Sequence, residues 1–98
     1  MLTKEYIQQT VSAYFIDKPV KKVYLFGSYA TGEANEKSDV DLSLVLNEDE
    51  QITYVTLAGY LIDLEKKLKN KIDIVEEKMI YRQFRPSIDQ SKILIYDR

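Results

Sequence analysis

One bend, Phe-Gly-Ser-Tyr-Ala-Thr-Gly at residues 26–32, constrains the fold of this chain more than any other stretch. Residues 20–26, which lead into the bend, are rich in β-branched and aromatic side chains and predict a strand. Gly27 ends this run, and its backbone can approach a ligand closely because it has no Cβ. Ser28–Ala30 can begin a short helix, which would direct free N–H groups and a hydroxyl at an anion such as a phosphate. The bend therefore predicts an anion site at the end of a strand.

Two carboxylates follow the bend, at the start of a second apolar run. Asp39 and Asp41 flank Val40, and residues 42–46 continue as Leu-Ser-Leu-Val-Leu. Residues two apart on a strand point to the same face, so the two carboxylates project together while Val40 points away. They repel each other unless a positive group lies between them, and beside a phosphate they form a place for Mg²⁺ to bridge protein and polyphosphate. The pattern predicts a nucleotidyl-transfer site, and the structural alternative is a polar strand edge.

A third carboxylate, Asp73, lies within Lys71–Val75, a segment that predicts another strand. Asp73 alternates with Ile72 and Ile74 and so faces away from their side. A lone charge inside an apolar strand needs a partner or a cation, and this context fits a functional role. The alternative is an Asp that is simply exposed on the open face of the sheet.

Four further segments complete the predicted fold. The first is a helix over 3–15 with Thr3 as its N-cap. The second is a helix that is opened by Asn47–Glu50, capped by Asn47 or Asp49, and runs to about Lys69 before a left-handed Asn70. The third is a broken helical pattern over 79–90, interrupted by Pro86, and the fourth is a final strand over 93–96. The polar link 32–38 is short enough to join the first two strands as an antiparallel pair. Together these elements predict one α/β domain over residues 1–98, with a mixed sheet of about four strands covered by helices mainly on one face.

Composition narrows the chemistry. The chain has no Cys and no His, which excludes a thiolate metal site and leaves a carboxylate, Lys or Tyr as the general base. The net charge of −2, from 14 basic and 16 acidic residues, does not favour general affinity for nucleic acid. No apolar stretch approaches the ~18 residues of a membrane span, and the first residues lack the apolar run of a signal peptide. We therefore expect a cytoplasmic protein.

A small basic and aromatic cluster lies near the C-terminus. Arg82 and Arg85 stand beside Tyr81 and Phe84. Arg and aromatic side chains are enriched in interfaces, so the cluster could contact a nucleotide or a partner, and a solvated helix face is the alternative. Lys37, close to the acidic pair in sequence, is interpreted as a surface lysine that could touch phosphate.

The bend and the acidic pair together resemble a known family. Gly27-Ser28, followed after ten residues by Asp39-x-Asp41, is similar to the motif of the polymerase-β-like nucleotidyltransferases. The fuller string GSYATGEANEKSDVDL resembles the minimal nucleotidyltransferases (MNT), small proteins often encoded next to a HEPN partner. The resemblance covers most of the chain and implies the nucleotidyltransferase fold. Thr31 stands where many relatives carry Arg, so the phosphate contact of that Arg is not implied here.

The resemblance also implies a role for each matched residue. Gly27 and Ser28 hold the β- and γ-phosphates of an incoming nucleotide. Asp39 and Asp41 hold Mg²⁺, and Asp73 completes metal binding in a site for two ions and helps to deprotonate the attacking hydroxyl. All three Asp residues are thus expected to be catalytic and metal-binding. The expected reaction transfers AMP from ATP to a hydroxyl.

With no second domain to bind an acceptor, we expect a partner to supply it. From the resemblance, this partner is a HEPN protein, a ribonuclease-type toxin, which is inhibited by transfer of AMP to its tyrosine side chain and forms a complex with this chain as antitoxin. One alternative is a catalytically weak or inactive module that neutralises its partner by contact alone. Another is nucleotide transfer to an antibiotic or to RNA, although the small size and slightly acidic charge leave little surface for either acceptor.

Overall fold

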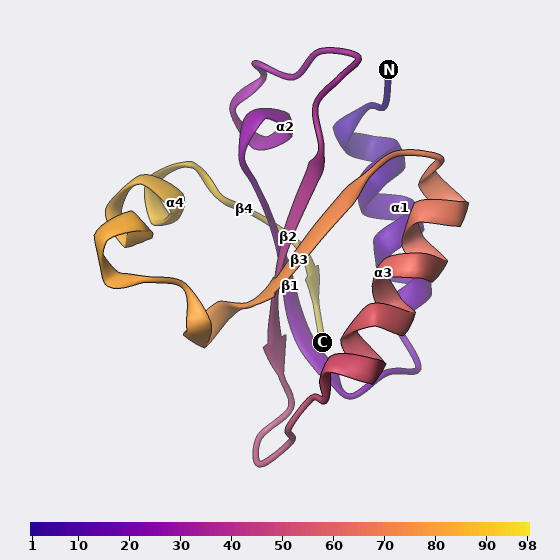
Figure 1. Ribbon diagram of the computed structural model, residues 1–98, viewed down its shortest axis with the longest axis vertical. Coiled ribbons are helices and arrows are strands. Elements are labelled where there is room, and N and C mark those ends of the chain that lie inside the picture. Colours follow the sequence, from indigo (N-terminus) through magenta and orange to yellow (C-terminus); the bar gives the residue numbers. More distant parts are fainter.

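Four strands form one mixed sheet in the computed structural model, which describes residues 1–98. The strands are β1 (Val20–Phe26), β2 (Val40–Leu46), β3 (Ile72–Glu76) and β4 (Ile93–Asp97). They stand in the order β3-β2-β1-β4 (Figure 1). β1 runs antiparallel to both β2 and β4, whereas β2 and β3 run parallel. The mixed four-stranded sheet and its antiparallel first pair are therefore confirmed.

Two helices, α1 (Lys4–Phe15) and α3 (Tyr54–Leu68), cover one face of this sheet (Figure 1). Because side chains alternate along a strand, Val40, Leu42 and Leu44 of β2 point toward these helices and are buried. The core consists of 17 hydrophobic residues: Ile7, Val11, Phe15, Val20, Val23, Leu25, Tyr29, Ala30, Val40, Leu42, Leu44, Tyr60, Leu64, Leu68, Ile72, Ile74 and Ile95. None of the helices is both long and apolar enough to cross a bilayer.

The acidic segment after β2 forms a turn and not the first turn of α3, so the predicted start of that helix is wrong. The N–H of Glu50 donates to the carbonyl of Asn47 at 3.0 Å, and Asp49 has a φ of 65°. A right-handed helix excludes this left-handed conformation. α3 therefore begins only at Tyr54, with Thr53 as its N-cap.

The other helix ends are partly as predicted. Thr3 caps α1, because its hydroxyl accepts from the N–H of Tyr6 at 3.1 Å. At the end of α3, Lys69 and not Asn70 is the left-handed residue, with a φ of 52°. The side-chain amide of Asn70 instead donates to the carbonyl of Ser38 at 3.0 Å. This hydrogen bond ties the link before β3 to the loop before β2.

The C-terminal segment covers part of the opposite face of the sheet (Figure 1). It contains two 3-10 turns and one short helix: η1 (Glu77–Met79), η2 (Arg82–Phe84) and α4 (Arg85–Ser91). Pro86 lies in the first turn of α4, where its missing N–H costs no hydrogen bond, so the proline begins a helix instead of interrupting one. After α4, the Lys92 Nζ lies 4.3 Å from the centre of the Tyr24 ring.

Candidate active site

The bend after β1 brings its backbone against the acidic pair. It contains one helical turn, α2 (Ser28–Thr31), preceded by Gly27 with a φ of 73°. L side chains rarely adopt this conformation. A Cβ on Gly27 would lie 2.2 Å from Oδ2 of Asp41, far inside van der Waals contact. Glycine is therefore required here for two reasons, and the bend and the carboxylate share one small space.

The strand register sets the carboxylates side by side. Asp41 of β2 pairs with Phe26 of β1 on one side and with Asp73 of β3 on the other. Register partners on neighbouring strands point to the same face. Asp41 and Asp73 therefore lie on the face opposite α1 and α3, whereas Val40 is buried under those helices. Asp39 precedes β2 by one residue and extends this acidic row.

The charges of the row act on one another. Asp41 is half-buried, and its pKa is raised from 3.8 to about 6. Burial is the largest cause, followed by the negative charges of Asp73 and Asp39. A cation among these carboxylates would remove the repulsion. The acidic row therefore favours the binding of a cation.

The donor set suits a Mg²⁺ ion that arrives with a substrate. Asp39 and Asp41 offer carboxylate oxygens, and Mg²⁺ sites commonly consist of one or two carboxylates completed by substrate phosphates and water. No group of three acidic side chains is arranged to hold an ion with protein ligands alone. Asp73 therefore stands beside the pair and does not close a cage around an ion.

The two hydroxyl groups of α2 differ in what they contact. The Thr31 hydroxyl donates to the carbonyl of Ser28 at 3.3 Å and is used inside the helical turn. No hydrogen bond within the protein uses the Ser28 hydroxyl, which lies next to Gly27. Thr31 thus turns back onto the backbone, while the Ser28 hydroxyl can donate to a ligand.

The basic and aromatic cluster does not form one binding surface. Arg85 is held by Glu77: its guanidinium donates to Oε1 at 2.5 Å and to the backbone carbonyl at 2.9 Å. Tyr81 and Phe84 contact each other, with ring centres 6.3 Å apart, and both are exposed. Arg82 is exposed as well. Arg85 is therefore a structural residue, separated in role from the others.

One basic residue, Lys92, forms ion pairs that the sequence did not predict. Lys92 Nζ lies 2.9 Å from Oδ1 of Asp89 and 3.3 Å from Oε1 of Glu77. A single Lys beside an apolar strand carries no signal, because its partners come together only in the fold. Lys37 is exposed, and its backbone N–H donates to the Asn35 side chain at 2.8 Å. It is a surface lysine in this structure.

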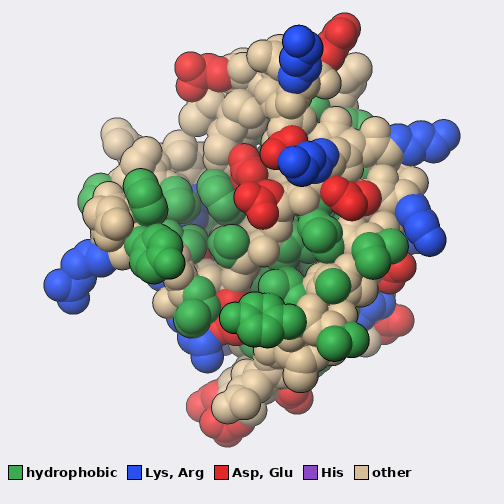
Figure 2. Space-filling view, in the orientation of Figure 1, with side chains coloured by type: hydrophobic (Ala, Val, Ile, Leu, Met, Phe, Trp, Pro, Cys, Tyr) green, Lys and Arg blue, Asp and Glu red, His purple; other side chains and the backbone are tan.

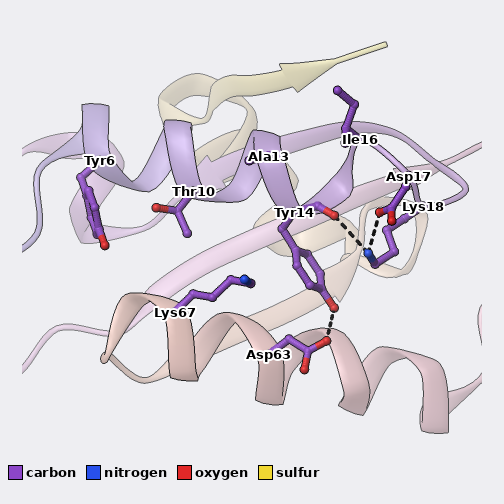
Figure 3. A pocket seen from close by; sticks show the side chains of 9 residues that line it. All are labelled: Tyr6, Thr10, Ala13, Tyr14, Ile16, Asp17, Lys18, Asp63 and Lys67. Atoms are coloured by element: carbon purple, nitrogen blue, oxygen red, sulfur yellow. Dashed lines mark hydrogen bonds and ion pairs between the residues drawn. The ribbon is translucent and has the colours of Figure 1, made fainter.

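One sizeable hollow lies away from the carboxylates. It measures about 760 Å³ and lies between α1 and α3 on the surface of the helical layer (Figure 3). Tyr14 donates to Oδ2 of Asp63 at 2.6 Å, and Lys18 lies 4.2 Å from the centre of the Tyr14 ring (Figure 3). Burial, with Asp63 as the second cause, raises the pKa of Tyr14 above its usual value. The phenol therefore stays protonated and joins the two helices.

The chain is similar to known proteins. The family model described as "Polymerase beta, Nucleotidyltransferase" matches residues 6–98. A Methanocaldococcus jannaschii protein named "Putative protein adenylyltransferase MJ1379" is 34% identical over 77 residues, which are 78% of this chain and 77% of that protein.

Two solved structures are also similar. One, described as a "putative minimal nucleotidyltransferase", has a TM-score of 0.74 and 29% identity, and the match covers 91% of this chain and 89% of that chain. The other is a complex of a tri-AMPylated HEPN toxin of Shewanella oneidensis with an MNT antitoxin. It matches with a TM-score of 0.74 and 14% identity over 96% of this chain and 72% of that chain. At that identity the second match speaks for the fold alone.

A mixed sheet with a Gly-Ser bend after one strand and an acidic pair at the start of the next defines the nucleotidyltransferase class of fold. This chain belongs to the polymerase β nucleotidyltransferase family. The family and the fold predicted from the sequence motif are thus confirmed.

Proposed function

We propose that this chain is a Mg²⁺-dependent protein adenylyltransferase of a toxin–antitoxin pair. It transfers AMP from ATP to a tyrosine hydroxyl of a HEPN-type toxin and so acts as the antitoxin. The relative named as an adenylyltransferase and the AMPylated toxin in the Shewanella oneidensis complex support this reaction and this partner. Because ATP is the donor, we expect the reaction in the cytoplasm, with residues 1–98 acting as one catalytic domain.

One observation carries the proposal: a Cβ on Gly27 would overlap Asp41, and Asp73 is the register partner of Asp41. The bend and the acidic row therefore meet at one place. In the proposed complex the N–H groups of the bend and the Ser28 hydroxyl bind the β- and γ-phosphates of ATP. This contact holds the nucleotide while its reacting phosphate lies against the acidic row.

The acidic row has two tasks. Asp39 and Asp41 would hold one Mg²⁺ on the triphosphate, and Asp73 would touch a second. Mg²⁺ supplies charge neutralisation of the phosphates and lowers the pKa of a bound hydroxyl. Asp73 is the exposed carboxylate of the three and can meet an acceptor from solvent.

The proposed step is an in-line displacement. The acceptor hydroxyl oxygen forms a bond with the α-phosphorus, and the bond between the α-phosphorus and the pyrophosphate oxygen breaks. The hydroxyl proton passes to Asp73, which is consistent with a chain that has no His. The contribution of the protein is mostly positioning and charge stabilisation.

A labelling experiment tests the proposal. The chain is incubated with Mg²⁺, ATP labelled on the α-phosphate and the purified product of the neighbouring gene. We expect label on that protein and a mass increase of one AMP per transfer.

Asp41→Asn should lower the rate about a hundredfold, the order expected when one group that stabilises transition-state charge is lost. Asp97→Asn, at an exposed site on β4, is the matched control and should keep activity. Absence of label with the wild-type chain would overturn the proposal.

A second candidate function is neutralisation of the partner by contact alone. One observation favours it: Thr31 stands where the family resemblance leads us to expect an Arg, so the phosphate contact of that Arg is missing. The double variant Asp39→Asn/Asp41→Asn separates the two functions. If it neutralises the toxin as well as the wild type does, contact is sufficient. If neutralisation is lost while the complex still forms, the chemistry is required.

A further inference from the structure

A shallow apolar groove runs along the free edge of the sheet. β3 is an edge strand that pairs only with β2, and α3 contacts it. Two adjoining hollows of about 210 and 400 Å³ lie between β3 and α3 and share three lining residues. We call them together the β3-edge groove. It is lined by Tyr54, Leu57, Leu61, Ile74, Met79 and, at one end, Asp73.

The groove reaches one carboxylate of the acidic row: Asp73 projects to the face opposite α3, but it also lines the smaller hollow because β3 is the open edge of the sheet. The smaller hollow contains Asp73 beside Leu61, and the larger one continues along β3 to Met79. Asp73 is the register partner of Asp41. An occupant of the groove therefore lies next to the carboxylate that is proposed to receive the acceptor proton.

The groove carries large apolar side chains in solvent. Tyr54 is 90% exposed, and Met79 is 68% exposed. Val55, next to the groove on α3, is 83% exposed. Figure 2 shows hydrophobic side chains gathered where α3 begins and β3 ends, with acidic side chains above them. Contiguous exposed apolar surface of this kind marks interaction sites.

The charge around the groove is mainly negative. The only charged residues that line the two hollows are Asp73 and Glu76. Asp49 and Glu50 line the adjoining hollow, which shares Glu76. The two basic residues of that hollow are paired, Lys78 with Glu76 at 3.2 Å and Arg85 with Glu77 at 2.5 Å. Asp73, Asp49 and Glu50 form no ion pair and leave the surroundings of the groove negative. An occupant with apolar side chains and flanking basic residues is therefore complementary.

We propose that the β3-edge groove is the docking surface for the acceptor protein. The acceptor lays an apolar segment with flanking basic residues along β3, and this contact brings its hydroxyl to Asp73. The inference rests on the proposed adenylyl transfer and adds where the protein substrate binds. A second copy of this chain is the competing occupant, because its own segment around Tyr81 and Phe84 is apolar, basic and exposed.

Binding and kinetic measurements on one pair of variants test the proposal. Tyr54→Ala/Met79→Ala removes apolar groups from the groove. The matched control, Tyr6→Ala/Ile16→Ser, removes exposed apolar groups from α1 and from the residue that ends it. The probe is the purified product of the neighbouring gene, with its Kd measured by calorimetry and its KM by label transfer. We expect the groove variant to raise both constants at least tenfold, with an unchanged Kd for ATP that reports an intact fold. The control should match the wild type.

The outcomes separate this inference from the proposed function. If the groove variant binds the partner as the wild type does, or if the wild type does not bind it, the docking inference is overturned. If binding depends on the groove but the wild type transfers no label, docking stands and adenylyl transfer fails. Sedimentation of the chain alone decides the occupant: a wild-type dimer that the groove variant dissociates would assign the groove to a second copy and overturn the inference.

Discussion

Gly27 is the residue on which the geometry of the site depends most directly. Its φ of 73° strains any L side chain, and a Cβ would meet Oδ2 of Asp41 at 2.2 Å. Gly32, at the other end of α2, has a φ of 85° but nothing within 4 Å of its Cβ position. A substitution of Gly32 therefore measures the cost of backbone strain alone, whereas a substitution of Gly27 adds the cost of displacing the Asp41 carboxylate.

Gly27→Ala should abolish label transfer, because Asp41 must move away from the bend. It should also lower the free energy of unfolding by about 2–3 kcal/mol, from strain and overlap together. Gly32→Ala should cost about 1 kcal/mol from strain alone and keep activity. Urea denaturation and the labelling assay measure both effects. Equal losses of activity in the two variants would contradict a specific role for the contact between Gly27 and Asp41.

Asp41→Asn should stabilise the metal-free protein at neutral pH. The pKa of Asp41 is raised in the folded state to about 6, so the folded protein binds more protons than the unfolded chain between about pH 4 and 6. Stability therefore falls as pH rises through this window. The gain at pH 7.5 should be about 1 kcal/mol, less than the full shift implies, because a half-exposed carboxylate is screened by solvent.

Urea denaturation in EDTA at pH 7.5 and pH 3.5 measures this gain. At pH 3.5 the gain should vanish, since the wild-type carboxyl is then protonated. A destabilised Asn variant at pH 7.5 would show that the ionised carboxylate has a favourable partner within the protein.

The elements that follow from side-chain periodicity were predictable, and so was the Thr3 cap of α1, but the start of α3 was not. The alternation of apolar residues around Asp41 and Asp73 placed both strands. The start of α3 was missed because the segment after β2 contains several residues that can cap a helix. The apolar stripe of α3 reaches back only to Leu57, which indicates Thr53 as the N-cap. The left-handed conformation of Asp49 excludes an earlier start of the helix, capped by Asn47 or Asp49.

Thr53→Ala should lower the free energy of unfolding by about 1 kcal/mol, because the N–H of Thr56 loses the hydroxyl that accepts its hydrogen bond. Asn47→Ala should change it by less than about 0.5 kcal/mol, since the hydrogen bonds of Asn47 in this turn are made by its backbone. Thermal and urea unfolding of the two variants make the comparison. A larger loss for the Asn47 variant would restore the earlier start of α3.

The arrangement of the whole sheet was only partly contained in the sequence. That Asp39 and Asp41 share a face follows from their spacing, but that Asp73 lies beside them depends on parallel pairing of β2 with β3. Local pattern does not fix strand order, and the expectation that Asp73 joins the pair came from the family resemblance. The β3-edge groove and the position of Lys92 arise from contacts between segments distant in the chain, so no local signal marks them. The roles of the three Asp residues and of Gly27 and Ser28 stay predictions.

Substrate binding should therefore act on the whole molecule through the acidic row. If Asp39 and Asp41 hold Mg²⁺ with ATP, the ligand removes the repulsion that raises the pKa of Asp41 and stabilises the folded state. At a hundred times Kd, binding contributes about 2.7 kcal/mol, which corresponds to a Tm increase of roughly 10 °C for a domain of this size. ATP with EDTA should give a much smaller increase.

Thermal unfolding of the wild type and of Asp39→Asn/Asp41→Asn, with ATP and either Mg²⁺ or EDTA, tests this dependence. The double variant should start from a higher Tm than the wild type in EDTA, because its row carries less charge, yet gain little from Mg²⁺ and ATP. This reversal of order is specific to a metal bound by the pair. If Mg²⁺ adds nothing to the effect of ATP on the wild type, or adds the same amount in the variant, the ion is not held by these residues, and the raised pKa of Asp41 reflects burial and neighbouring charge alone.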